Sequence, residues 1–201
     1  MKVIGITGGI GSGKSSVCAL LEGRGARVFY ADRVARELQV SDAGVQREIV
    51  HAFGSEAYLE DGSLNRAYLA SRVFSSDEDR KRINAIVHPA VARAFTRYLA
   101  DVVETGVELV VKEAALLFQT DTRALDEIWV VDAPRELRVQ RVMERDSLSR
   151  DEVEARMGSQ LPAREMRRRA DRVVVNDGSR SRLEEDVRRC YDAMMNNTDE
   201  T

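Results

Sequence analysis

The sequence predicts an α/β protein in which a parallel five-stranded sheet is flanked by helices and carries a helical insertion and a helical lid. Three observations lead to this prediction. Short apolar, β-branched runs alternate with helical patterns, a glycine-rich segment joins the first run to the first helix, and about 75 residues without a strand pattern separate the second run from the third. A parallel crossover needs only about a dozen residues, so this separation predicts an insertion.

Five segments are expected to form the strands of the sheet. Each is a short run rich in Val, Ile or other apolar residues, which is typical of a strand buried on both faces. These segments are residues 2–7, 27–30, 108–112, 127–131 and 172–175.

Helices are expected between these strands. Pro134 suits the first position of the helix 134–145, and Ser181 with Glu184 has the capping-box pattern that would open the helix 181–195. The other helices expected between strands are residues 15–21 and 89–104.

The insertion is expected to be wholly helical. Helix-like pieces cover residues 45–53, 67–74 and 77–86, and Leu59–Gly62 has the composition of a turn,. A second, charged segment at residues 146–170 opens with the capping-box pattern of Ser149 and Glu152, and we interpret it as a mobile helical flap. The expected domains are a core of residues 1–32 and 106–201 that includes this lid, and an inserted domain of residues 33–105.

Length and composition exclude several classes of protein. The chain has 201 residues, 43% of them hydrophobic and 32% charged, so it can build a core and is not disordered,. Its net charge of −3 provides no general attraction for nucleic acid or an anionic membrane,. Because no signal peptide or long apolar run is visible and both cysteines are expected to be buried thiols, we expect a cytoplasmic protein.

The strongest functional signal is the segment Gly8–Ser15, GGIGSGKS, which matches the pattern of a phosphate-binding loop placed between a strand and a helix,. The glycines let backbone N–H groups converge on phosphate oxygens, and the helix N-terminus adds positive potential. In such a loop Lys14 reaches the β and γ phosphates of a nucleotide and the Ser15 hydroxyl binds magnesium.

Asp32 follows the second expected strand, at the edge of the sheet where α/β proteins place catalytic groups. A carboxylate there could orient and deprotonate a hydroxyl nucleophile. The alternative is that Asp32 is the N-cap of a helix beginning at Arg33, and its position alone does not decide between these two hypotheses.

Arginines gather between residues 135 and 172, and Arg138, Arg141 and Arg145 have the spacing of one helical face,. Guanidinium groups suit the charge of transferring phosphoryl oxygens. The alternative is a solvated face in which Glu136 and Glu144 are the local partners. For the cluster as a whole, the neighbouring phosphate loop favours a function.

Other candidates are less distinctive. Glu113, at the end of a strand, could be an outer-shell magnesium group, whereas Asp132 has the position of a cap before Pro134. Ala114–Phe118 could be core or could contact an apolar part of a substrate. His88 is expected to cap the inserted region as a structural residue, and no residue spacing suggests a zinc site.

The motifs favour a small-molecule kinase. A GTPase would need an Asn-Lys-x-Asp guanine reader, and none of the four lysines follows an asparagine. A nucleic-acid ATPase would normally carry aromatic residues for stacking, but these make up only 5% of the chain,. The rivals are a kinase acting on a nucleoside or sugar, and a regulatory nucleotide-binding switch without an acceptor.

Over nearly its whole length the chain resembles the dephospho-coenzyme A kinase family. The resemblance rests on the order and spacing of several short motifs. These are ITGGIGSGKSSV, ADRVARE, FG with DGSLNR, INAIVHP, ALLF, QRVMERD and ADRVVVNDG. It implies a P-loop kinase core, a coenzyme A domain formed by the insertion, and an arginine-rich lid.

The resemblance also implies an activity, namely the transfer of a phosphoryl group from Mg-ATP to the ribose 3′-hydroxyl of dephospho-coenzyme A. The partners expected are these two small molecules, with no nucleic acid, membrane or obligate protein. Asp32 would be the base, and Lys14 and Arg141 would act on the phosphoryl group.

The remaining site residues expected on this basis fall into two groups. Those for ATP are Gly11, Ser12, Gly13, Lys14, Ser15, Ser16, Arg145 and Asn176. Those for the acceptor are Thr7, Asp32, Arg66, His88 and Leu116. The chain departs from the family pattern at Ser16, Tyr30, Ala115 and Gln119, and none of these departures removes a phosphate-binding residue or the base.

Overall fold

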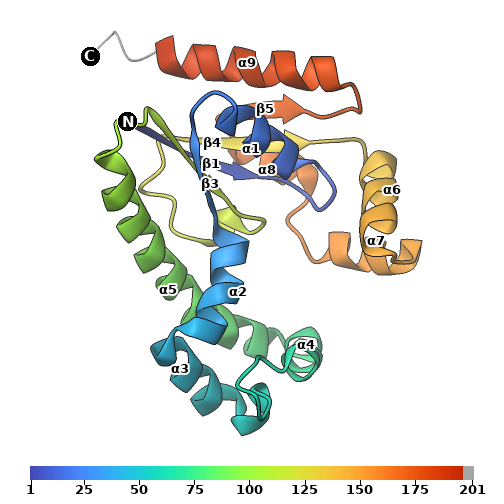
Figure 1. Ribbon diagram of the computed structural model, residues 1–201. Helices are drawn as coiled ribbons and strands as arrows, with labels where there is room; N and C mark the ends of the chain where they lie inside the picture. The colour runs from blue at the N-terminus through green and yellow to red at the C-terminus, as the bar shows by residue number, and fades with distance from the viewer. Residues whose placement is uncertain (197–201) are drawn as a thin grey trace. The chain divides into compact units, whose positions relative to one another are not determined.

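The computed structural model of the chain describes residues 1–196 and divides them into two compact units (Figure 1). The first unit comprises Met1–Phe29 and the residues from Val102 onward, and the second comprises Tyr30–Asp101. These boundaries lie a few residues before those expected from the sequence.

The first unit is built on a five-stranded sheet with the strand order β2-β3-β1-β4-β5. Strand β1 pairs in parallel with β3 and β4, and β4 pairs in parallel with β5. The strands are β1 (Lys2–Thr7), β2 (Arg27–Tyr30), β3 (Leu109–Glu113), β4 (Glu127–Asp132) and β5 (Arg172–Val175). All five strands expected from the sequence are therefore confirmed to within one residue at each end.

Helices flank this sheet, as the fold class predicts. Helix α9 packs against β5 and α1, α8 packs against β4, and α6 packs against α7 (Figure 1). Their bounds are α1 (Lys14–Glu22), α6 (Arg135–Asp146), α7 (Arg150–Gly158), α8 (Ala163–Arg169) and α9 (Arg180–Asn196), with a short 3-10 turn, η2 (Leu117–Gln119). The central strands are apolar on both faces, and Ile4, Val110 and Trp129 have no exposed surface.

The second unit is helical and has its own core. Its elements are α2 (Ala31–Ser41), α3 (Ala43–Phe53), the 3-10 turn η1 (Ser55–Ala57), α4 (Arg66–Ser75) and all but the end of α5 (Asp77–Val103). Val45, Ile49 and Phe53 recur at intervals of four along α3 and pack with Leu69 and Ala90 from the later helices,. The insertion is thus a small helical bundle, as expected.

Local signals explain several boundaries. Asp42 caps α3 by accepting hydrogen bonds from the N–H groups of Gly44 and Val45 at 2.8 and 3.1 Å, and these bonds hold the pKa of the Asp42 carboxyl below its usual value,. The turn expected at residues 59–62 is present, with Gly62 donating to the Leu59 carbonyl at 2.9 Å. The capping box of Ser149 and Glu152 opens α7 as predicted.

The expectation that a helix starts at Pro89 is wrong. Helix α5 runs without interruption from Asp77 to Val103, with Pro89 inside it, so His88 is a mid-helix residue and caps nothing. Proline removes one backbone donor and disfavours a helical conformation in the preceding residue. Here that cost is outweighed by burial, because Val87 and Ala90 are held in the core on either side of an exposed Pro89.

Two expected helix starts are also wrong by one or two residues. Helix α9 begins at Arg180, so Ser181 lies inside it, and Ser179 accepts a hydrogen bond from the Arg182 N–H instead. Pro134 is the N-cap of α6 and not its first helical residue. In α9 the capping side chain is therefore that of Ser179, and α6 begins one residue later than expected.

Among the described residues, no helix combines the length and apolar character that crossing a membrane requires.

Candidate functional site

The segment Gly8–Ser15 forms a loop between the end of β1 and the start of α1, as its motif predicts. Gly8, Gly11 and Gly13 have positive φ angles of 152°, 76° and 93°, a backbone conformation that L side chains rarely adopt,. A Cβ atom on Gly8 would also overlap the Val131 carbonyl, and one on Gly13 would overlap the side chain of Asn176. The glycines therefore serve both the turn and the close approach of neighbouring segments.

Lys14 is held over the loop in a position suited to phosphate. Its Nζ donates to the Gly8 carbonyl at 3.1 Å and lies 4.0 Å from Oε1 of Glu113 at the end of β3. Both side chains are 13% exposed. The ammonium group is thus placed at the first residue of the loop, while the exposed Ser15 lies in the first turn of α1.

Two distant segments tie the loop in place. Nδ2 of the buried Asn176, which follows β5, donates to the Ser12 carbonyl at 2.9 Å, and its Oδ1 accepts from Arg141 Nη2 at 3.1 Å. Arg141 Nη1 lies 3.4 Å from the Gly11 carbonyl. On the other side, the Ile10 N–H donates to Oε1 of Gln160 at 2.8 Å. The structure therefore brings Arg141 and Asn176, two of the expected site residues, directly onto the loop.

The three arginines on one face of α6 do not share one environment. Arg145 is exposed and makes a two-pronged ion pair with Asp146 at 2.7 and 2.8 Å, so it lies outside this arrangement. Arg138 and Arg141 both touch the loop. The alternative of a solvated face fails for these two, since Glu136 pairs with Arg150 and Arg135 instead.

Asp132 is not a helix cap, contrary to expectation. Its carboxylate forms an ion pair with Arg167 of α8 at 2.5 Å, and its carbonyl accepts from the Asn176 N–H at 2.7 Å. Asp132 is the last residue of β4, next to the loop. Its carboxylate therefore pairs with Arg167 of α8 and does not cap the helix that follows Pro134.

The flap contributes two residues that sequence reasoning missed. Gln160, between α7 and α8, and Arg167, on α8, both contact groups at the loop or the adjoining strand end. A lone glutamine carries no recognisable pattern, and Arg167 is one of three consecutive arginines. Only the path of the chain in space distinguishes them.

Asp32 belongs to the second unit, and the structure places it within its own segment. Helix α2 begins at Ala31 with Tyr30 as its N-cap, so Asp32 is the second helical residue and the alternative that it caps a helix beginning at Arg33 is wrong. Tyr30, which departs from the family pattern, has its ring 5.2 Å from the Arg33 guanidinium. The hypothesis that Asp32 is the base stays a prediction.

The apolar segment after β3 is divided between core and surface. Ala114 and Leu117 are buried, whereas Leu116 is half-buried. Thr7 is buried and donates its hydroxyl hydrogen bond to the Ala115 carbonyl at 3.3 Å. The core hypothesis is therefore confirmed for Ala114 and Leu117, while contact of the partly exposed Leu116 with a substrate stays a prediction.

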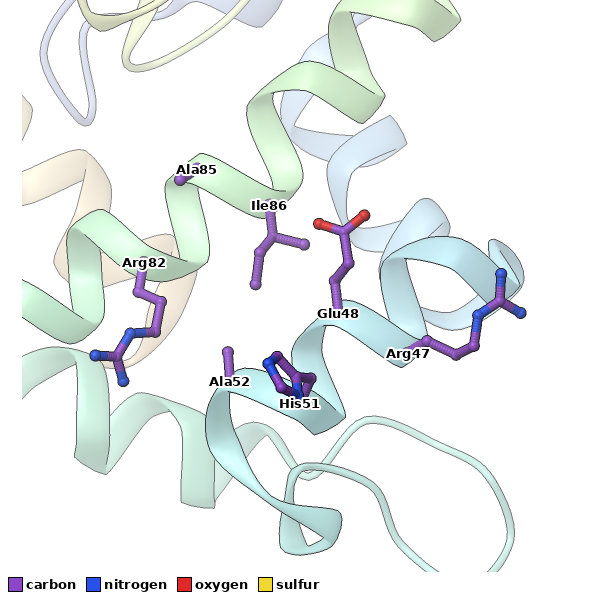
Figure 2. Close-up of a pocket in the computed structure, with 7 residues that line it drawn as sticks. All are labelled: Arg47, Glu48, His51, Ala52, Arg82, Ala85 and Ile86. Atoms are coloured by element: carbon purple, nitrogen blue, oxygen red, sulfur yellow. The ribbon is translucent and has the colours of Figure 1, made fainter.

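In the helical unit, Arg66 is the exposed first residue of α4 and His88 is half-buried in α5. This unit also contains an open cavity of about 610 Å³ between α3 and α5 (Figure 2). In Figure 2, Glu48 and Ile86 project into the space between the helices, whereas Arg47 and Arg82 extend away from it. Neither Arg66 nor His88 lines this cavity.

The residues at the loop fit a magnesium ion that is bound together with nucleotide phosphates. Among residues 1–196 there is no cluster of three or more His, Cys, Asp or Glu side chains that could hold a metal by themselves. The loop offers instead the Ser15 hydroxyl and, near Lys14, the Glu113 carboxylate. Magnesium is commonly bound by one or two protein oxygens, substrate phosphates and water, so this sparse donor set suits it.

Comparison with known proteins supports the resemblance seen in the sequence. A family model described as dephospho-CoA kinase matches residues 2–182. The dephospho-CoA kinase of Salinibacter ruber is 48% identical over 180 residues, which cover 89% of this chain and 90% of that protein. That of Geobacter sulfurreducens is 44% identical over 185 residues, covering 92% and 94%.

The fold is supported independently by a crystal structure of a protein from Thermus thermophilus. It superimposes with a TM-score of 0.81 at 39% identity and covers 98% of this chain and 97% of its own. The expectation of a P-loop kinase fold is confirmed, and the chain belongs to the dephospho-CoA kinase family.

Proposed function

We propose that this chain transfers the γ-phosphoryl group of ATP to the ribose 3′-hydroxyl of dephospho-coenzyme A, giving coenzyme A and ADP. The observation that carries the proposal is an intact phosphate-binding loop, with Lys14 held over Gly8, in a chain 48% identical to a dephospho-CoA kinase. The reaction is the last step of coenzyme A synthesis, and we place it in the cytoplasm. Its partners are the two small molecules, and the proposal includes no nucleic acid, membrane or obligate protein.

On the donor side, backbone N–H groups of the loop and the Lys14 ammonium would bind the phosphates of ATP. Phosphoryl transfer needs positioning and charge stabilisation more than covalent chemistry, and a preformed loop provides both. The residues assigned to ATP are Gly11, Ser12, Gly13, Lys14, Ser15, Ser16 and Asn176, with Arg145 contributing only if it leaves Asp146.

On the acceptor side, Asp32 would accept the proton of the 3′-hydroxyl while the hydroxyl oxygen forms its bond to the γ-phosphorus. The bond between that phosphorus and the bridging oxygen breaks at the same time, and ADP leaves with the electron pair. A positioned general base contributes about 100- to 10,000-fold to such a rate. The position of Asp32 at the start of α2, where it is not used as a cap, supports this role.

Arg141 would stabilise the charge on the transferring group. Its guanidinium already lies against the Gly11 carbonyl and Asn176, so little reorganisation is needed. Residues 146–170, which include α7 and α8, would form the lid. The lid would exclude water, which would otherwise accept the phosphoryl group. The bond from Ile10 to Gln160 supports a lid that touches the loop.

The inserted domain, residues 33–105, would bind the acceptor. The residues assigned to the acceptor are Asp32, Thr7, Arg66, His88 and Leu116, of which Arg66 and His88 belong to the inserted domain. The exposed guanidinium of Arg66 suits an anionic group of dephospho-coenzyme A, and the partly exposed Leu116 suits an apolar portion,.

Magnesium is the metal proposed to accompany ATP. Ser15 would bind it directly and Glu113 would hold its outer shell. When bound, the ion neutralises part of the charge on the β and γ phosphates.

The test is ADP formation from Mg-ATP with dephospho-coenzyme A, in parallel with adenosine, AMP and gluconate and with no acceptor. We expect ADP only with dephospho-coenzyme A. Asp32→Asn should lower turnover at least about 100-fold while ATP binding is retained. Glu37→Gln, on the exposed face of the same helix α2, is the matched control and should keep wild-type turnover.

Other outcomes would reassign the protein. Turnover with a different acceptor would keep a kinase and change the role of the inserted domain. ATP binding without acceptor-dependent turnover would favour a regulatory switch. Near-normal turnover in Asp32→Asn would contradict the assignment of the base.

A further inference from the structure

Arg138, on α6, has a different environment from the two other arginines of its helical face. Arg141 donates its hydrogen bonds to Gly11 and Asn176, and Arg145 is paired with Asp146. By contrast, Nε of Arg138 is buried and has no hydrogen-bond partner in the part of the chain that the structure describes. Of the three, Arg138 is therefore the one with a donor still to be satisfied.

The backbone and the side chain of Arg138 both lie against the phosphate-binding loop. Its carbonyl is so near Gly11 that a Cβ there would approach to 2.5 Å, and its Nη1 occupies the space that a Cβ on Gly9 would need. Gly9 has no positive φ, unlike Gly8, Gly11 and Gly13. A Cβ at position 9 would thus displace the guanidinium of Arg138, whereas the backbone conformation there would accept it.

A second unsatisfied group lies in the same place. Ser12 Oγ is the other buried side-chain atom without a hydrogen-bond partner among residues 1–196, and it belongs to the loop itself. Buried polar groups are nearly always hydrogen-bonded, and an exception calls for an explanation such as a catalytic role or a bound water or ion. That both exceptions occur at the phosphate-binding loop points to a ligand there with hydrogen-bond acceptors.

The charges around Arg138 also favour an anion. The carboxylate that acts on Arg138 is that of Asp132, which is already paired with Arg167, and Arg135 and Arg167 add further positive charge. Burial, together with these two arginines, lowers the pKa of the Arg138 guanidinium, although an arginine stays protonated,. An anion bound beside Arg138 would stabilise the buried guanidinium charge and would offset the repulsion from Arg135 and Arg167.

The position along the loop indicates which phosphate this is. Lys14 Nζ reaches back to the Gly8 carbonyl, and Nη1 of Arg138 stands against Gly9, so the two cations converge on the first two residues of the loop. Asn176 and Arg141 contact the opposite end, at Gly11–Gly13. In loops of this type the lysine reaches the β and γ phosphates, so Arg138 lies at the end that receives the terminal phosphate.

We propose that the Arg138 guanidinium donates hydrogen bonds to an oxygen of the terminal phosphate of bound ATP, and so distinguishes ATP from ADP. This assignment rests on the proposed function for the identity of the nucleotide, but not for the identity of the acceptor. Arg138 is then a substrate-contacting residue in addition to Lys14 and Arg141.

The test compares the binding of Mg-ATP and Mg-ADP to the wild-type protein and to Arg138→Gln by titration calorimetry without acceptor. Losing a charge-assisted hydrogen bond should weaken ATP binding by about 10- to 100-fold, whereas ADP, which lacks the terminal phosphate, should bind within about threefold of wild type. Arg138→Lys, which keeps the charge, should recover part of the loss. Arg180→Gln, which removes an exposed arginine paired with Glu184 on α9, is the control and should change neither affinity.

A second measurement separates a ligand contact from a purely structural role. Gly9→Ala should weaken ATP binding in the wild-type background by displacing the guanidinium, and should add little in the Arg138→Gln background, where that space is empty. Equal losses for ATP and ADP in Arg138→Gln, or no loss for either, would overturn the proposal. Acceptor-dependent ADP formation by the wild-type protein is read separately, so a failure of the proposed function remains distinguishable.

Discussion

The phosphate-binding loop and the helical unit are stabilised by contacts of different range. The loop is tied by side chains that come from beyond β5 and from the flap, more than 100 residues away in the sequence, as in the bond from Asn176 to Ser12. The helical unit is held by an apolar core and by short-range polar contacts, such as Tyr68 donating to the Phe53 carbonyl at 2.7 Å. The comparison teaches that the shape of the loop depends on contacts from distant parts of the first unit, whereas the helical unit is held by contacts within its own segment.

The largest effect is expected from Lys14→Ala, which removes the cation of the loop. Turnover should fall by about 1,000-fold, on the scale of removing a main stabiliser of transition-state charge, and ATP binding should weaken as well. Steady-state ADP formation and calorimetry measure the two effects. Lys81→Ala, an exposed lysine of the helical unit, should leave both unchanged. Turnover within tenfold of wild type in Lys14→Ala would contradict the role of this loop.

The next effect tests the helical unit through its core. Ile49 is fully buried, so Ile49→Ala should lower the free energy of unfolding by about 2–5 kcal/mol,. In the neighbouring Val50→Ala, where the side chain is 40% exposed, the loss should be below about 1 kcal/mol,. Urea unfolding gives both values. If ATP affinity of the folded Ile49→Ala protein fell in step with stability, the two units would not be as separate as the comparison implies.

A smaller effect is expected from Asn176→Ala, which breaks the long-range tie of the loop. The change leaves the buried Ser12 carbonyl and one donor of Arg141 without partners, at a cost of about 1–3 kcal/mol,. We expect ATP to bind about tenfold more weakly, with lower thermal stability. Asn176→Asp keeps the acceptor for Arg141 and should lose less. An Asn176→Ala protein with unchanged ATP affinity would show that the loop holds its shape alone.

The smallest effect is the pH dependence that the buried Cys18 thiol of the first unit gives to stability. Burial raises the pKa of the Cys18 thiol from 9.0 to about 12, with the negative charge of Glu113 contributing. Between these two values the unfolded chain loses the proton and the folded chain keeps it, so stability falls as pH rises through this range.

Thermal unfolding at pH 7.5 and pH 10 measures this dependence. Between the two pH values, the free energy of unfolding should fall by about 1–2 kcal/mol more in the wild-type protein than in Cys18→Ala. The same loss in both proteins would assign the effect to other groups.

Local pattern was sufficient for the strands, the loop and several turns. Alternating strands and helices, the glycine motif and the capping box at Ser149 all depend on residues within a few positions of one another, and all were confirmed. The errors arose where local signals competed with burial or with a neighbouring cap, as at Pro89, Ser181 and Asp132. In these places, packing of the whole unit decided the outcome.

By itself, the sequence determined the fold class, the phosphate-binding loop and the family, because each is encoded in residue order and spacing. The tertiary structure alone decided the partners of the three arginines on one face of α6. Arg138 lies against Gly9, Arg141 contacts Asn176, and Arg145 pairs with Asp146. It also decided that Gln160 and Asn176 reach the loop. Those contacts join segments that only the folding of the sheet brings together, and no local pattern encodes such a distance.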